Sequence, residues 1–162
     1  MFIEKWKDTA FGSDYGGDFK DFLEEIPDKK LTLSIIYDRC DLKRYFDDPK
    51  LLREQTDNNV KIENKSFSHH VHYEDAVIAL SAVVVESELA GVADLTKAYG
   101  SKKLVFDISK HELITLKNAL SEIYDHPNNF ILFDMLLSEE TNHVKQDIAE
   151  IIDGLDECIA NK

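Results

Sequence analysis

The sequence is poor in the residues that build rigid turns, covalent cross-links or fibrous repeats. Its 162 residues include only six Gly, three Pro and two Cys. This composition argues against collagen-like, low-complexity and disulfide-stapled chains. Cys40 and Cys158 lie far apart and have no metal-finger spacing, so we expect two free thiols. Cys158 should pack as a small hydrophobic side chain beside Ile159.

Long hydrophobic runs and leader-like segments are also missing. The longest apolar run, residues 76–85, is interrupted by Ser81 and falls short of the roughly 18 residues that a membrane span needs. The first residues carry Glu4 and Asp8 where a signal peptide needs a basic patch followed by an apolar stretch. The sequence therefore predicts a cytoplasmic protein without a membrane partner.

The motifs of common enzymes and cofactor sites do not occur. The chain has no GxxxxGK[ST], GxSxG or HExxH motif, and no kinase signature. Gly16 and Gly17 lack the third glycine and the preceding strand of a dinucleotide loop, so we interpret them as a flexible turn. We accordingly expect no cofactor, no catalytic residue and no enzymatic activity.

What the sequence does contain is acidic charge. Its 32 Asp and Glu residues outnumber its 19 Lys and Arg residues, which gives a net charge of −13. The excess gathers in residues 14–28, 74–94 and 138–159. Such a surface repels nucleic-acid backbones and anionic membranes, and it favours a basic protein partner.

Hydrophobic periodicity predicts several helices. Residues 18–26 carry one apolar stripe, with Asp18 as N-cap and Pro27 beyond the end. Asp48 and Pro49 indicate the start of a short helix. Further helices are predicted from the S-x-x-E capping box at Ser109 and Glu112, and over residues 138–159 with Ser138 as cap. Residues 74–91, almost wholly apolar at first and ended by Gly91, should form a central buried helix.

Shorter segments predict strands. Alternating or continuous apolar residues indicate strands over residues 1–6, 31–38, 60–73, 101–108 and 128–136, with a bend at 64–66. Together these elements predict a single α+β domain spanning residues 1–162, with a mixed β-sheet packed by helices around the buried helix. A doubly wound α/β sheet is the alternative.

The segment SFSHHVHYED, residues 66–75, concentrates the candidate metal ligands. It holds His69, His70 and His72, which are three of the six histidines. On a strand His70 and His72 point to the same side, and Asp75 can add a carboxylate. A catalytic zinc site needs a third protein ligand, which no second motif supplies. We interpret the segment as a structural junction without an assigned metal, in which Glu74 and Asp75 complement a helix dipole.

The stretches YEDAVIALSAVVVESELAG (residues 73–91) and NNFILFDMLL (residues 128–137), with the small size and acidity, resemble one class of protein. They are similar to bacterial immunity proteins of contact-dependent growth inhibition and related polymorphic toxin systems. The resemblance implies a non-enzymatic protein that neutralises a cognate toxin, in many cases a nuclease with a basic cleft. Carboxylates of this chain would then occupy the positions of nucleic-acid phosphates and pair with the Lys and Arg residues of the toxin.

Under this interpretation the toxin contacts the outer faces of the first and last acidic helices. The candidate residues are Asp14, Asp18, Asp21, Glu25, Asp147, Glu150, Asp153, Asp156 and Glu157. Two other functions remain open at this point. One is a metal-dependent hydrolase that uses His70, His72 and Asp75, and the other is a non-enzymatic adaptor or regulatory subunit.

Overall fold

The computed structural model describes residues 2–54, 59–63 and 71–162, and most of these residues are helical. The predicted bend at 64–66 lies outside the described residues. The helices are α1 (Phe2–Ala10), α2 (Asp14–Glu25), α3 (Leu33–Tyr37), α4 (Lys43–Asp47), η1 (Pro49–Glu54), α5 (Tyr73–Ala90), η2 (Leu95–Lys97), α6 (Lys110–Asp125), η3 (Pro127–Asn129), α7 (Ile131–Asp134) and α8 (Ser138–Ala160). None of these helices is long and apolar enough to cross a bilayer.

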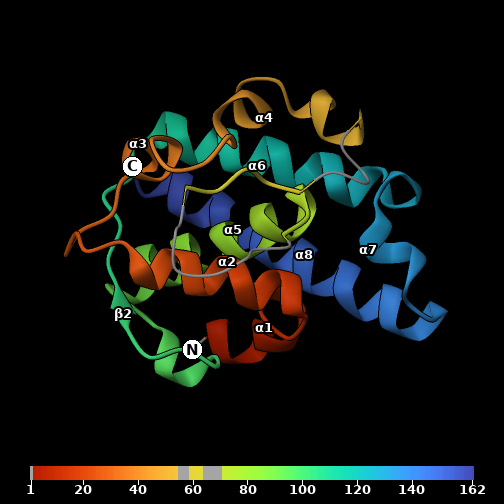
Figure 1. The fold of residues 1–162 in the computed structure, drawn as a ribbon, viewed down its shortest axis with the longest axis horizontal. Coiled ribbons are helices and arrows are strands. Elements are labelled where there is room, and N and C mark those ends of the chain that lie inside the picture. Colours follow the sequence, from red (N-terminus) through yellow and green to blue (C-terminus); the bar gives the residue numbers. More distant parts are fainter. Residues whose placement is uncertain (1, 55–58, 64–70) are drawn as a thin grey trace.

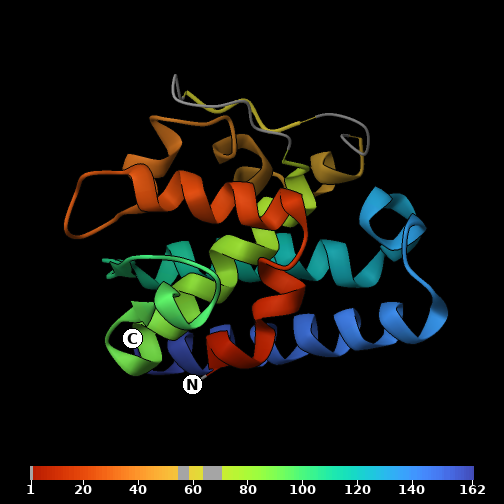
Figure 2. The ribbon, with the colours of Figure 1, turned by 60° about the horizontal axis from the view of Figure 1, so that its bottom comes forward.

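Helix α5 lies at the centre, as its sequence predicts. Every residue from Tyr73 to Ser87 is buried. Helices α1, α2, α6 and α8 all pack against it, with α2 and α8 on opposite sides (Figures 1 and 2). The helix ends at Gly91, whose φ of 84° is left-handed, a conformation that glycine adopts without steric cost.

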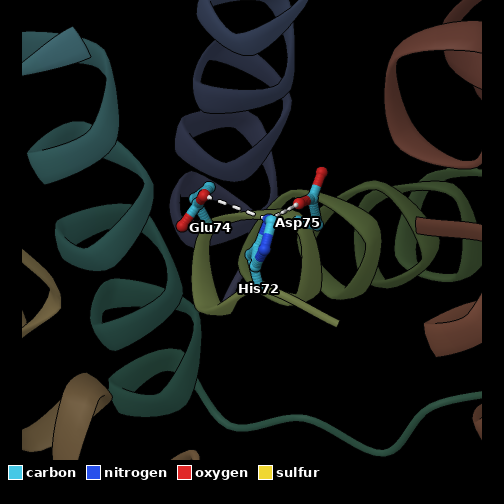
Figure 3. A group of neighbouring side chains, drawn as sticks. All are labelled: His72, Glu74 and Asp75. Atoms are coloured by element: carbon cyan, nitrogen blue, oxygen red, sulfur yellow. Dashed lines mark ion pairs between the residues drawn. The ribbon is translucent and has the colours of Figure 1, made fainter. Parts of the chain in front are cut away.

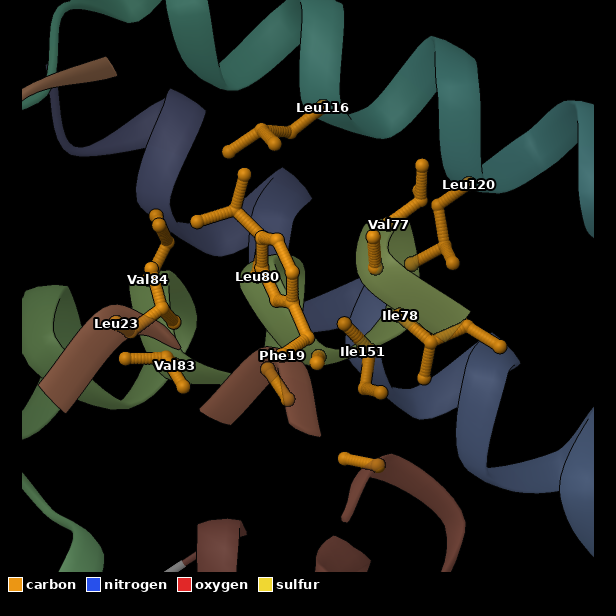
Figure 4. Close-up of a cluster of buried hydrophobic side chains, with 14 of the residues drawn as sticks. Phe19, Leu23, Val77, Ile78, Leu80, Val83, Val84, Leu116, Leu120 and Ile151 are labelled. Atoms are coloured by element: carbon orange, nitrogen blue, oxygen red, sulfur yellow. The ribbon is translucent and has the colours of Figure 1, made fainter. Parts of the chain in front are cut away.

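The hydrophobic core is built by side chains that the surrounding helices direct at α5 (Figure 4). Phe19 and Leu23 of α2 contribute from one side, and Ile151 of α8 from another. Leu116 and Leu120 belong to the buried stripe of α6. An amphipathic helix gains most of its stability by burying such a stripe, and this burial fixes the positions of α2, α6 and α8.

The predicted α+β class is confirmed, but the sheet is smaller than predicted. Strand β1 (Ala93–Asp94) pairs antiparallel with β2 (Lys103–Leu104), so that Ala93 lies opposite Leu104. Outside this pair, the described residues contain only isolated bridges, one of them parallel between Leu31 and Phe106. The mixed sheet and the doubly wound alternative were therefore wrong.

The strand predicted over residues 1–6 is helical. Ile3, Trp6 and Ala10 are buried at spacings of three and seven, which places them on one face of α1. The carboxylate of Glu86, a buried residue of α5, accepts a hydrogen bond from the Ile3 amide at 3.2 Å. This contact satisfies one of the donors that a helix N-terminus leaves unpaired.

The strands predicted over residues 31–38 and 128–136 are replaced by short helices. Thr32 is the N-cap of α3, and its hydroxyl accepts a hydrogen bond from the Ile35 amide at 3.2 Å. Residues 128–136 contribute to η3 and α7 instead. Apolar alternation over so few residues does not distinguish a strand from a buried helical turn.

Helix α2 begins earlier than predicted. Its N-cap is Ser13, not Asp18, because the Ser13 hydroxyl accepts a hydrogen bond from the Gly16 amide at 3.1 Å. Gly16 and Gly17 therefore lie in the first turn of the helix rather than in a flexible turn before it. A Cβ atom on Gly16 would lie 2.1 Å from the Ala10 carbonyl oxygen, so the corner between α1 and α2 requires glycine.

The helices predicted from caps and long stripes are confirmed. Ser109 and Glu112 form the reciprocal capping box that starts α6. Pro49 opens η1, which is a 3₁₀-helix. Helix α8 spans Ser138–Ala160, although its first turn is held by the Glu140 carboxylate, which accepts from the Leu137 amide at 3.3 Å, rather than by Ser138.

Helices α5 and α8 approach each other closely at Gly154. A Cβ atom at this position would lie 2.6 Å from Cγ1 of the buried Val85. Gly154→Val should therefore lower the free energy of unfolding by about 1–3 kcal/mol through overpacking, as measured by urea denaturation. In a double-mutant cycle Val85→Ala should relieve part of this cost, and additive effects would contradict the steric explanation.

Candidate functional site

Three of the predicted partner-binding residues form an acidic patch on the outer face of α8. Asp153, Asp156 and Glu157 are exposed, and their spacing of three and four places them on one side of the helix. Asp156 pairs with Lys117 of α6 at 2.5 Å. We call these three residues the α8 acidic patch. Like charges at such spacings repel one another on an isolated helix, so the patch is not favoured by helix stability alone.

Asp147 and Glu150, also on α8, are engaged by α1. Asp147 is buried, and its Oδ2 accepts a hydrogen bond from the Thr9 hydroxyl at 2.5 Å. Glu150 pairs with Lys5 at 2.6 Å and accepts a hydrogen bond from the Trp6 indole at 3.1 Å. The hydrogen bonds from Lys5 and Trp6 lower the pKa of Glu150. These two carboxylates hold α1 against α8. Asp147 is buried and therefore poorly placed for a direct contact with another protein, whereas Glu150 remains half-buried.

The candidates on α2 lie on a different part of the surface. Asp14, Asp21 and Glu25 are exposed and Asp18 is half-buried. Asp21 pairs with Lys20 at 3.1 Å. Helix α5 lies between α2 and α8, so the acidic residues of α2 and the α8 acidic patch belong to helices that pack against different sides of α5 (Figure 2). The fold thus separates the two helices that the sequence analysis treated together.

A cavity of about 220 Å³ opens beside the α8 acidic patch. Asp153 and Glu157 line it together with Glu150 and the exposed ring of Phe2. The Phe2 ring stacks on the ring of Trp6, with centroids 5.4 Å apart. Lys5 also lines the cavity and pairs with Glu150. The carboxylates of Asp153 and Glu157 and the Phe2 ring are therefore the groups that can receive a further guanidinium or ammonium group.

The histidine segment leads into the start of α5, as predicted. His69 and His70 lie outside the described residues. His72 is the N-cap of α5, and Glu74 and Asp75 lie in the first turn. His72, Glu74 and Asp75 are all buried. Figure 3 shows the imidazole between the two carboxylates, with Nδ1 3.8 Å from Oε1 of Glu74 and 3.5 Å from Oδ2 of Asp75.

Burial perturbs the carboxyl groups at the start of α5. Burial and the charge of Asp75 raise the pKa of Glu74 to about 7, although hydrogen bonds to backbone amides and the proximity of His72 act in the opposite direction. Burial also raises the pKa of Asp75. An ionised carboxylate is costly in such surroundings unless a cation or several hydrogen-bond donors accompany it.

The cysteines do not offer a nucleophile. Both are buried free thiols, as expected, and Cys158 packs into the core. Burial raises the pKa of Cys40 to about 12, despite a hydrogen bond at the Leu42 backbone that lowers it. The thiolate form that nucleophilic catalysis needs is therefore disfavoured at neutral pH.

Sequence reasoning missed two contributors to these sites. Phe2 was assigned to a strand, and its place beside α8 depends on a contact between the first and last helices that no local pattern reveals. Glu74 was given only a role in the helix dipole, although its spacing of two from His72 and one from Asp75 was visible. Its burial follows from the position of α5 in the centre of the fold.

Comparison with models of known protein families gives a match over nearly the whole chain. A family model described as Immunity protein 68 matches residues 2–155. No curated protein matches the chain, and no solved structure does.

Proposed function

The chain belongs to the Immunity protein 68 family and is therefore a non-enzymatic immunity protein that binds a cognate toxin, and we propose that it does so through the α8 acidic patch. The family assignment confirms the predicted recognition and the predicted absence of enzymatic activity. It also argues against the alternative of a metal-dependent hydrolase.

The arrangement around the cavity carries the proposal. Exposed carboxylates of Asp153 and Glu157 lie beside the exposed ring of Phe2, at the wall of a cavity of about 220 Å³. Like charges held close together and an exposed aromatic ring are both unfavourable in the unbound protein. A cationic partner would neutralise the charges and cover the ring. An arginine of the toxin can stack on Phe2 while its guanidinium pairs with the carboxylates.

The same chemistry suggests the kind of toxin. A nuclease binds phosphates through a basic cleft, and such a cleft presents lysine and arginine side chains to any acidic partner. We infer that the α8 acidic patch occupies this cleft in place of nucleic acid. The net charge of −13 supports a basic partner and opposes direct binding of nucleic acid or of anionic membranes.

The cellular setting belongs to the same proposal. We infer that the protein acts in the bacterial cytoplasm, within a contact-dependent inhibition or related toxin system. Its two free cysteines agree with a reducing compartment.

The immunity function can be tested by co-expression. The cognate toxin domain, to be sought among the neighbouring genes, should stop growth when expressed alone in a bacterial host, and co-expression of this chain should restore growth. Purified toxin domain should also form a complex with the chain and lose its nuclease activity. A toxin that stays active in the presence of excess chain would contradict the proposal, whereas inhibition of a toxin without nuclease activity would contradict only the inferred chemistry.

Electrostatic attraction should dominate the rate of association. We expect the association rate constant with the toxin to fall by about 10- to 100-fold between 20 and 500 mM salt, because ions screen the acidic surface. The dissociation rate constant should change much less. Stopped-flow fluorescence of the Trp6 signal or of a labelled toxin measures both. A rate of association that does not depend on salt would indicate an uncharged interface.

A further inference from the structure

The start of α5 gathers three side chains of metal-binding type inside the protein. His72, Glu74 and Asp75 are 8%, 1% and 3% exposed. Each offers one ligand atom, and these atoms all lie within 4.8 Å of one another. They approach from one helical turn and its N-cap, with the imidazole between the two carboxylates (Figure 3).

The negative charge of this cluster is poorly compensated. Within the part of the chain that the structure describes, the ion pairs of Glu74 and Asp75 involve His72 and no Lys or Arg. Among these residues Glu74 Oε1 and Asp75 Oδ2 accept no hydrogen bond of good geometry, and the contact of Asp75 Oδ2 with His72 Nδ1 at 3.5 Å is a long one. Native proteins seldom leave buried carboxylate oxygens without a donor, since the cost of desolvation is then not recovered. These carboxylate oxygens are therefore suited to bind a cation.

The distances agree with a small divalent cation. Zinc binds imidazole nitrogen and carboxylate oxygen at about 2.0–2.2 Å, so tetrahedral ligand atoms lie roughly 3.4 Å apart. The Nδ1 atom of His72 is 3.5 Å from Asp75 Oδ2 and 3.8 Å from Glu74 Oε1. Since all three ligand atoms lie within 4.8 Å of one another, the two carboxylates would have to move closer together on binding, and the fourth position would be left for water or another ligand.

We propose that His72, Glu74 and Asp75 bind one divalent transition-metal ion, with zinc as the best fit to one nitrogen and two oxygen donors. The ion has a structural role. The His72 ring contacts Tyr15 of α2 with centroids 4.2 Å apart, so a metal on Nδ1 would fix the start of α5 against α2. This inference goes beyond the proposed immunity function and does not depend on it.

The test uses the untagged protein, stripped of metal with a chelator and dialysed. Addition of ZnCl₂ should give one bound ion per chain in equilibrium dialysis, and it should raise the melting temperature by about 5–10 °C once zinc reaches 100 times its Kd. Glu74→Gln and Asp75→Asn keep the side-chain shape, and each should weaken zinc binding at least 10-fold. The matched control is His143→Asn, which removes an exposed histidine 3.4 Å from Asp147 and should bind zinc normally.

Cobalt keeps the proposal testable if the variants fail to fold. CoCl₂ added to the stripped wild-type protein should produce the intense visible absorption of a four-coordinate site, and one equivalent of ZnCl₂ should remove it. Failure of the wild-type protein to bind either metal would overturn the proposal. Unchanged binding by folded Glu74→Gln and Asp75→Asn, or loss of binding in the His143→Asn control, would also overturn it.

Discussion

Changing Asp153, Asp156 and Glu157 together to lysine is expected to weaken binding of the cognate toxin by about 1,000-fold. Close charge pairs across protein interfaces couple by about 1.5–7 kcal/mol, and a loss of about 4 kcal/mol corresponds to this factor. The reversal replaces attraction by repulsion at the edge of the cavity. Titration calorimetry, or competition with labelled wild-type protein, measures the change.

A matched control separates a local effect from net charge. Asp38, Asp47 and Asp48 are exposed around α3 and α4, on the opposite side of the molecule from α8 (Figure 2). Changing all three to lysine alters the net charge equally and should weaken binding much less, mainly through slower association. Undiminished binding by the α8 variant would contradict the proposed surface, and equal losses in both variants would indicate a non-specific charge effect.

Glu24→Ala is expected to lower the free energy of unfolding by about 3–5 kcal/mol, because it removes one partner of a buried charged network. Glu24 is buried, and its Oε2 accepts hydrogen bonds at 2.6 Å from the Ser101 and Lys102 amides. It also lies 3.9 Å from the ammonium group of the buried Lys20. The substitution would leave the amides and the ammonium group with less compensation. Urea denaturation with an unchanged m-value measures the loss.

The next residue provides the control. Glu25 is exposed on the same helix, so Glu25→Ala should change the free energy of unfolding by no more than about 0.5 kcal/mol. If both variants lost a similar amount of unfolding free energy, the loss would come from a general weakening of helix α2 and not from the network around the Ser101 amide. Because α2 and α8 pack against different sides of α5, toxin affinity measured under folding conditions should be the same for Glu24→Ala as for the wild-type protein.

How well the sequence predicted the fold depended on the length of each element and on its caps. Helices α5, α6 and α8 extend over four or more turns, and the capping box of Ser109 and Glu112 marked one start directly. The strands predicted over residues 1–6, 31–38 and 128–136 rested on only a few alternating residues each. Residues 1–6 are helical with Ile3 in contact with α5, and residues 31–38 contain a helix capped by Thr32. Only the capping residue could be recognised in the sequence.

The charge pattern predicted acidic surfaces but not which carboxylates remain free to meet a partner. Asp147 lies four residues before Ile151 and seven before Gly154, so it belongs to the buried stripe of α8, and this signal could have been used. The engagement of Glu150 by Lys5 and Trp6 could not be predicted, since it requires the packing of α1 on α8. The cavity beside Phe2 depends on the same packing.

The contacts between α1 and α8 join residues at opposite ends of the sequence. Lys5 and Glu150 are separated by 145 positions, and the cavity takes one wall from each helix. On the ribosome, α1 emerges long before the segment that completes this cavity. A growing chain therefore lacks the proposed docking surface until the residues of α8 up to Glu157 have been synthesised, so nascent chains that are shorter than this should not protect.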